Sequence, residues 1–355
     1  MLYNDLAYGF WNFEPVNGGP LMKKLFALLL CLSMLLPLMP VMAEEAESEY
    51  QYDATTLREF YLRQEPNDDA RLAGKVPKGK VVNVIEYGQE WSLVEYRNKK
   101  GYAKTEYIFK FHSHDPFKYT VPGYEKPYGI GTMAIEFNTK GMAGRTMNYG
   151  GNELFPGDKL TVHYYDAERD VATILVWRTY IELPAGAMTD ITPFVDYNEA
   201  QPGDMIAGYT TYTSMKYGMP YHKNRHFNIE RAVNFINGAV LKAGEDFSYN
   251  SYVGPYTKAN GYKQARITGA SGVGIGGGTC QISILTYSTI LGLPFRLTTH
   301  YTHTDEGSDY ALRVCDATVG NRRDLCFINL LPYDVRFETT WDANGMANML
   351  IYRAN

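Results

Sequence analysis

Cysteine is scarce in this chain. Its 355 residues include four, Cys31, Cys280, Cys315 and Cys326. Small secreted domains that depend on disulfides use cysteine far more densely, so this composition excludes a disulfide-stapled scaffold. The length instead suits two or three ordinary domains, each with a hydrophobic core of its own.

The chain also lacks a large excess of either charge and has no long basic run. It carries 34 Lys and Arg against 39 Asp and Glu, for a formal net charge of −5. Proteins that bind nucleic acids neutralise phosphates with clustered basic side chains. We therefore predict no nucleic-acid partner, and the composition leaves the oligomeric state open.

The usual metal-binding patterns are absent as well. The sequence has neither a Cys-x-x-Cys pair nor a His-Glu-x-x-His motif. Cys280, His300, His303 and Asp305 are ligand types within one region, and they remain an alternative metal set. The prediction is that the protein uses no metal and no cofactor.

The longest apolar run is too short to span a membrane. Lys23 and Lys24 precede an apolar run over 25–39, and Ala43 stands just before two glutamates. A spanning helix needs about 20 apolar residues, whereas a basic start, a short apolar core and a small residue are typical of a secretory signal. We predict a signal peptide over 22–43, with a retained N-terminal anchor as the alternative.

The predicted signal peptide also determines how the residues before and after it are interpreted. Residues 1–21 do not resemble a targeting segment, so we interpret them as an upstream extension included in error before Met22. Residues 44–51 are polar and acidic and indicate a linker. The mature protein would be exported, secreted or associated with the cell wall, and would touch the membrane only through an uncleaved signal.

Glycine gathers in one place, where five of the seven residues from 272 to 278 are glycine. Such a run disfavours a helix or strand and indicates a loop that something approaches closely. We predict a binding role for its last three glycines, Gly276, Gly277 and Gly278. Thr279 is a good N-cap, so Cys280 falls in the first turn of a helix over 282–291. A thiol there has a lowered pKa, which is typical of a nucleophile.

The sequence around this loop resembles the VanW-like family, named for the accessory W protein of vancomycin-resistance clusters. The resemblance runs from about Met205 to Tyr352. Its matching positions include Asn224-Arg225, Asn228-Ile229, Asn237-Gly238, Gly244 to Ser248, Val253-Gly254-Pro255, Gly261-Tyr262, His303, Tyr310, Asp316 to Val319, Asp324-Leu325, Phe327 and Asn329. The resemblance implies an envelope context, and it implies little about mechanism.

Three residues in this region have the order of a thiol enzyme. Cys280 at a helix start is followed by His303 and then Asp316, an order similar to that of the papain and transglutaminase superfamily. The imidazole would take the thiol proton and the carboxylate would orient the imidazole, while Gln281 and backbone N–H groups would stabilise an oxyanion. The alternatives are that Cys280 is a buried core residue, and that His300 takes the place of His303. The VanW-like resemblance favours His303.

The N-terminal part has short alternating strands separated by turns about every ten residues, which predicts a small barrel. Residues 52–111 also resemble the bacterial Src-homology-3-like domain, and the resemblance implies binding of wall peptide. Tyr61, Trp91 and Tyr102 are the predicted groove aromatics. The alternative is a spacer domain that binds nothing.

The remaining segments complete a multidomain chain. Residues 112–130 indicate a linker, 131–204 a β-rich segment, and 205–355 an α+β domain with a helix over 228–238 and strands from Leu312 onward. If Gly320-Asn321 is a two-residue hairpin turn, Cys315 and Cys326 lie opposite each other, as packed thiols or as a strained disulfide.

Two functions follow from these observations. The first is an exported envelope protein that binds peptidoglycan or a wall-associated partner, with the barrel holding wall peptide. The second is a thiol hydrolase or transpeptidase that acts on peptidoglycan stem peptides. Whether the Cys280 sulfur is open and near an imidazole distinguishes them.

Overall fold

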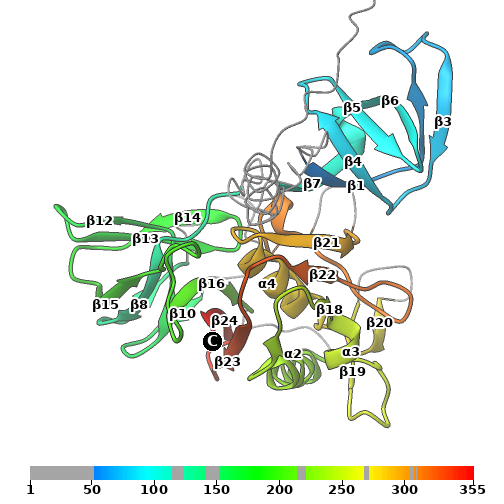
Figure 1. Cartoon of the computed structure of the whole chain (residues 1–355). Coiled ribbons are helices and arrows are strands. Elements are labelled where there is room, and N and C mark those ends of the chain that lie inside the picture. Colours follow the sequence, from blue (N-terminus) through cyan, green and yellow to red (C-terminus); the bar gives the residue numbers. More distant parts are fainter. Residues whose placement is uncertain are drawn as a thin grey trace, which may run out of the picture. The chain divides into compact units, whose positions relative to one another are not determined.

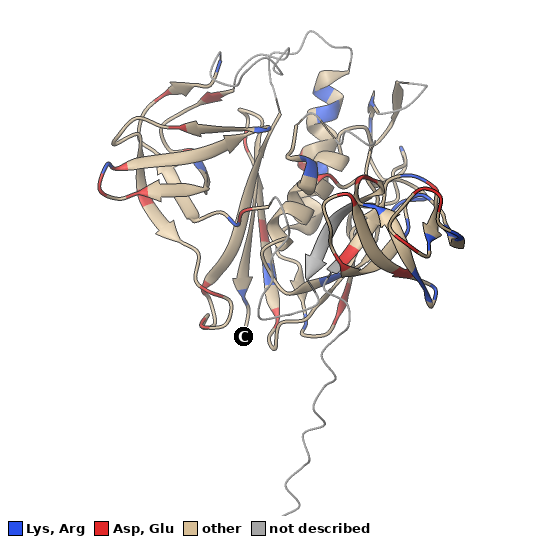
Figure 2. Cartoon of the chain, turned by 90° about the horizontal axis from the view of Figure 1, so that it is seen from above, with Lys and Arg blue, Asp and Glu red and all other residues tan. Residues whose placement is uncertain are grey.

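The computed structural model describes residues 52–113, 124–140, 152–213, 221–267, 272–303, 308 and 310–355. The predicted signal peptide, the upstream extension and the linker over 44–51 lie outside the described residues. Among the helices that the structure does describe, none combines the length and apolar character that crossing a membrane requires. Along the described ribbon, basic and acidic residues are interspersed (Figure 2), in keeping with the absence of a basic run.

The N-terminal part is one antiparallel sheet of seven strands in the order β3-β2-β6-β5-β4-β1-β7 (Figure 1). The strands are β1 (Tyr52–Thr56), β2 (Phe60–Arg63), β3 (Leu72–Val76), β4 (Val81–Glu86), β5 (Trp91–Tyr96), β6 (Lys99–Lys104) and β7 (Ile108–Ser113), with the 3-10 helix η1 (Thr105–Tyr107) before β7. Buried Leu62, Val84 and Val94 alternate with more exposed neighbours, as expected for strands with one face on a core. Within the described residues the edge strands β3 and β7 do not pair, so the small barrel predicted from the sequence is an open one.

The middle segment is entirely β among its described residues. Its strands are β8 (Gly129–Met133), β9 (Phe137–Asn138), β10 (Glu153–Leu154), β11 (Lys159–Val162), β12 (Tyr164–Asp166), β13 (Val171–Val176), β14 (Thr179–Glu182) and β15 (Met188–Pro193). They form three small sheets, ordered β10-β9, β11-β8-β15 and β12-β13-β14. Leu160, Val162 and Ile174 are fully buried in a core of this segment, which Met346 also joins.

The C-terminal part is mixed, as predicted. Its strands are β16 (Met205–Tyr212), β17 (Val240–Leu241), β18 (Asp246–Ser248), β19 (Gln264–Arg266), β20 (Val273–Ile275), β21 (Phe295–Thr299), β22 (Cys326–Asn329), β23 (Val335–Trp341) and β24 (Met346–Arg353). Its helices are α2 (His222–Ile236), α3 (Tyr249–Val253), α4 (Cys280–Ile290) and the 3-10 helix η2 (Arg313–Cys315). The sheets are ordered β16-β24-β23-β17, β18-β22-β21 and β19-β20. The fold class predicted from the sequence is confirmed.

Helix α4 is the centre of this part. Every residue from Gln281 to Ile290 is buried, and α4 packs against β16, β24, α2 and η2. A helix that is buried on all sides belongs inside a domain, and the polar residues of α4 are buried with the apolar ones. Cys280 is the partly exposed first residue of this buried helix.

Some predicted elements differ from the observed ones. Helix α2 begins at His222, six residues before the predicted start. The prediction missed its first turns because they carry polar side chains that give no apolar period. The predicted strand after Leu312 is replaced by η2 and irregular chain, and β22 begins only at Cys326.

The predicted pairing of Cys315 with Cys326 is wrong. Gly320 pairs with Arg323, so the tight turn is formed by residues 321 and 322, and no ladder continues back to Cys315. Cys315 ends η2 and is buried, while Cys326 opens β22 opposite Ser248. Both are free thiols.

Candidate active site

The glycine loop positions the start of α4 by letting the rest of the chain approach it. A Cβ atom at any of the last three glycines would lie about 3 Å or less from a neighbouring atom. The neighbours are the side chain of Tyr256 at Gly276, the carbonyl oxygens of Ala265 and Arg266 at Gly277, and the side chain of Arg225 at Gly278. The close approach inferred from the sequence is therefore made by the protein's own chain at these three positions.

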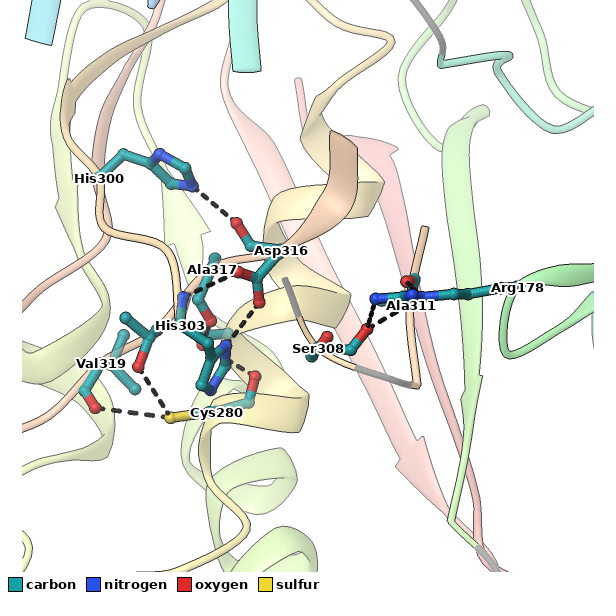
Figure 3. Close-up of polar contacts among 11 residues, drawn as sticks. Arg178, Cys280, His300, His303, Ser308, Ala311, Asp316, Ala317 and Val319 are labelled. Carbon is teal, nitrogen blue, oxygen red and sulfur yellow. Dashed lines mark hydrogen bonds and ion pairs between the residues drawn. The ribbon is translucent and has the colours of Figure 1, made fainter. Parts of the chain in front are cut away.

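Cys280, His303 and Asp316 form a hydrogen-bonded chain at the end of α4. Asp316 accepts a hydrogen bond from the backbone N–H of His303 at 2.8 Å, and its other oxygen lies 2.5 Å from His303 Nδ1. His303 is in turn hydrogen-bonded to the Cys280 thiol. Figure 3 shows the imidazole ring between the carboxylate and the sulfur. The three residues predicted from the sequence are brought together in the predicted order.

The electrostatics of the pair favour the charged form of each group. Burial raises the pKa of Cys280, but the hydrogen bond and charge of His303, together with hydrogen bonds with Val319 and Thr318, outweigh it, so the thiol pKa lies below its ordinary value of 9.0. Burial lowers the pKa of His303, whereas Asp316 and Cys280 raise it, and the result is about 9. The side chain of His303 is 5% exposed and that of Asp316 is 0% exposed, so water screens these charges little.

Two residues shortly after Asp316 contact the sulfur. Cys280 Sγ lies 3.6 Å from the hydroxyl of Thr318 and 3.5 Å from the carbonyl oxygen of Val319. The hydroxyl of Ser283, one turn into α4, donates to the carbonyl of Ala317 at 2.7 Å. These contacts fix the segment that carries Asp316 against the helix that carries the thiol.

His300 has a different role from the one considered in the sequence. It is 1% exposed; Nε2 lies 2.9 Å from the carbonyl oxygen of Asp316, and Nδ1 lies 2.8 Å from the hydroxyl of Thr55 in β1. Its ring also packs on Tyr287 of α4, with centroids 4.5 Å apart. His300 therefore holds the backbone of Asp316, while His303 faces the thiol.

The side-chain amide of Gln281 donates its hydrogen bonds elsewhere and does not serve as the predicted oxyanion donor. Its Nε2 donates to the carbonyl of Tyr212 at 2.8 Å and to the hydroxyl of Thr211 at 3.2 Å. Its Oε1 accepts from Thr213 and, at 2.8 Å, from Arg225 Nη2. Both amide protons are thus engaged with β16 and its end. The backbone N–H groups of Gln281, Ile282 and Ser283 donate to the carbonyls of Gly278 and Thr279. Among the described residues, the N–H of Cys280 itself is the first-turn donor that remains available to an oxyanion.

Tyr310 lies near Cys280 and His303, and Arg225 lies beside the Tyr310 ring; residue chemistry alone gave neither residue a role. The Arg225 guanidinium is 5.7 Å from the Tyr310 ring centroid, and that ring is 6.4 Å from the His303 ring in an edge-to-face arrangement. Arg178, between β13 and β14, donates to the carbonyls of Ser308 and Ala311 and so holds the chain on either side of Tyr310 (Figure 3). Arg225 and Tyr310 were both among the positions that match the VanW-like family, and that match was the signal in the sequence that could have identified them.

The three predicted groove aromatics share one outer face of the N-terminal sheet. Each alternates with a buried neighbour: Tyr61 with Leu62, Trp91 with Ser92, and Tyr102 with Ala103. Tyr102 pairs with Arg63 in β2 and Trp91 pairs with Lys104 in β6, and directly paired residues point to the same side. The Lys104 ammonium lies 5.5 Å from the Trp91 ring centroid.

The alternative metal set is not assembled in the described part of the chain. Within those residues no group of three or more His, Cys, Asp and Glu side chains is arranged to hold an ion. Asp305, the fourth residue of that set, lies outside the described residues.

Comparisons with known proteins agree with the two resemblances. Residues 224–351 match the family model described as VanW like protein, and residues 56–109 match that of the bacterial SH3 domain. The chain therefore combines a bacterial SH3 domain with a VanW-like domain, and the whole candidate site lies in the latter.

Two curated relatives share part of this sequence. The uncharacterized protein YoaR of Bacillus subtilis is 34% identical over 85 residues, which cover 23% of this chain and 28% of YoaR. The vancomycin B-type resistance protein VanW of Enterococcus faecalis is 31% identical over 110 residues, or 29% of this chain and 40% of that protein. The chain thus spans less than half the length of either relative. No solved structure matches.

Proposed function

We propose that this protein is an exported cell-envelope enzyme whose VanW-like domain transfers acyl groups through Cys280. The single observation that carries the proposal is the hydrogen-bonded chain from Asp316 through His303 to Cys280, a partly exposed residue whose thiol pKa is lowered. A buried structural cysteine needs no such partners. Peptide bonds of peptidoglycan stem peptides are the proposed substrates.

The chemistry needs only these residues and a peptide. The thiolate of Cys280 attacks the carbonyl carbon of a peptide bond, and the backbone N–H of Cys280 donates to the oxyanion. The imidazolium of His303 gives its proton to the leaving amine, and a thioester remains on the sulfur. Water or a second amine then attacks the thioester while the imidazole accepts the attacking group's proton. Water gives hydrolysis and an amine gives transpeptidation.

The bacterial SH3 domain supports a second function, retention on the wall. Tyr61, Trp91 and Tyr102 lie on one face, with Lys104 over the indole ring, and exposed aromatic faces stack on peptide and sugar groups. In this proposal the sheet binds peptidoglycan and the VanW-like domain acts on the same polymer. A protein that only binds, with an inert VanW-like domain, is the competing proposal.

Incubation with purified peptidoglycan tests the enzymatic proposal. Soluble products and cross-links are separated by chromatography and identified by mass spectrometry. The native protein should cut or form a peptide bond, and Cys280→Ala should do neither while still folding. Cys326→Ala, a matched loss of a partly exposed thiol, should keep the activity. The same products from native protein and Cys280→Ala, or none from either, would leave the binding protein as the better account.

A further inference from the structure

Arg225 places a positive charge against the Gln281 side chain and the Tyr310 ring, and the mechanism above does not use it. It lies in the first turns of α2, and its Cγ atom would be 2.9 Å from a Cβ atom on Gly278, two residues before Cys280. Its Nη2 donates to Gln281, the residue that follows the nucleophile, at 2.8 Å. The guanidinium is therefore held against the loop and helix turn that carry the thiol.

Among the described residues, the neighbours of this guanidinium are neutral groups. They are the amide oxygen of Gln281 and the phenol of Tyr310, which is both hydrogen-bonded to Arg225 and beneath its charge. The same phenol senses the charge of Cys280, so Tyr310 lies close to both the sulfur and the guanidinium. A guanidinium has five N–H donors, and these contacts with the described residues leave some of them for a ligand.

We propose that Arg225 binds a carboxylate of the substrate, so that the acyl donor is a peptide with a free carboxylate close to the bond that Cys280 attacks. This inference rests on the proposed function and names its substrate class. A planar guanidinium in a half-buried setting matches a carboxylate through two parallel hydrogen bonds. The carboxylate can be the C-terminus of the peptide or an acidic side chain, and Arg225 recognises the group that both share.

Two alkylating reagents that differ only in charge test the inference without a known substrate. Iodoacetate carries a carboxylate and iodoacetamide carries a neutral amide of nearly the same size. Each reacts by displacement of iodide by the Cys280 thiolate, and mass spectrometry gives the rate at Cys280. In Arg225→Gln the ratio of the iodoacetate rate to the iodoacetamide rate should fall at least about fivefold from its native value, because a buried counter-charge contributes several-fold in local affinity.

Controls separate charge recognition from a structural effect. Arg225→Lys should keep much of the ratio, since it keeps the charge. Lys223→Gln removes a charge from an exposed position on the same turn of α2 and should leave the ratio unchanged. A purely structural role for Arg225 would slow both reagents equally and leave the ratio as in the native protein, which would overturn the inference.

The source of the carboxylate is then identified by protection. Acetyl-alanyl-alanine carries only a C-terminal carboxylate, the α-amide of acetyl-glutamic acid carries only a side-chain carboxylate, and acetyl-alanyl-alanine amide carries none. One of these acids should slow iodoacetamide labelling of Cys280 in the native protein and not in Arg225→Gln. The position of its carboxylate identifies which carboxylate Arg225 binds. Failure of Cys280 to react with iodoacetamide at all would refute the proposed function itself, whereas normal reaction with an unchanged reagent ratio refutes only this inference.

Discussion

Replacing His303 with alanine should reverse the direction of the Cys280 pKa shift. Among the influences on this thiol, the hydrogen bond and charge of His303 are the largest that lower its pKa, and burial is the largest that raises it. The substitution removes the first and retains most of the second. The pKa of Cys280 should therefore move from below the ordinary value of 9.0 to above it.

The expected change in the thiolate fraction of Cys280 can be worked out from the ordinary thiol pKa. At pH 6, a thiol with a pKa of 9.0 is only ~0.1% thiolate, and each unit of pKa changes that fraction about tenfold. Ultraviolet absorbance of the thiolate, measured against Cys280→Ser, follows the titration directly. Cys326 does not interfere, because burial and the neighbouring Asp324 carboxylate raise its pKa to about 12. The native protein should titrate below pH 9 and His303→Ala above it.

His300→Gln is the matched control for this titration. His300 is also a buried histidine three residues away, but it binds the carbonyl of Asp316 and the hydroxyl of Thr55. Its loss should reduce stability by about 1–3 kcal/mol, the usual consequence of an unsatisfied buried group, while Cys280 still titrates below pH 9. Identical titrations of native protein and His303→Ala would refute the reasoning.

Three further predictions follow. In Cys280→Ala, His303 should titrate below its native pKa of about 9, because burial still lowers that pKa while the hydrogen bond and charge of Cys280, which help to raise it, are lost; the ring-proton chemical shifts of His303, followed against pH by NMR, compare the variant with the native protein. Gly278→Ala should destabilise by about 1–3 kcal/mol, since φ is +109° and the added carbon would meet Arg225 at 2.9 Å; an unchanged denaturation midpoint would contradict the packing described here. Trp91→Ala should weaken retention on purified peptidoglycan in a pull-down, and equal retention would make the N-terminal sheet a spacer.

Local signals in the sequence were sufficient to locate the proposed nucleophile at a helix start. The glycine run and the apolar segment after it place Cys280 in the first turn of a helix over 282–291, and α4 begins at Cys280. The expected N-cap is wrong, because the Thr279 side chain caps no N–H group of α4. Strand alternation likewise predicted the outward positions of Tyr61 and Trp91, because period-two patterning assigns faces without tertiary information.

Long-range contacts were beyond the same reasoning. Gln281 looked like an oxyanion donor from its place next to Cys280, but its amide protons are taken by Thr211 and Tyr212, about seventy positions earlier in the chain. The glycine loop indicated close approach correctly, yet sequence cannot say whether a ligand or the protein's own backbone makes it. The choice between His300 and His303 needed the family resemblance, because spacing alone places both near the thiol.

Sequence reasoning also could not place Arg225 near the candidate site. It stands 55 positions before Cys280, in helical turns without an apolar period, and only the fold brings it to Gly278 and Tyr310. The predicted pairing of Cys315 and Cys326 failed for a related reason. Burial of Val314 and Cys315 against the core favours η2 over the extended strand that a hairpin would need.

Labelling of the native protein at pH 6 tests the central claim most directly. Iodoacetamide is added for a short time, and mass spectrometry measures the modified fraction at Cys280, Cys315 and Cys326 separately. The account predicts that Cys280 reacts at least about tenfold faster than the other two, since its thiolate alone is held by an imidazolium. Protection of Cys280 equal to that of buried Cys315 would contradict the claim that Cys280 is a nucleophile.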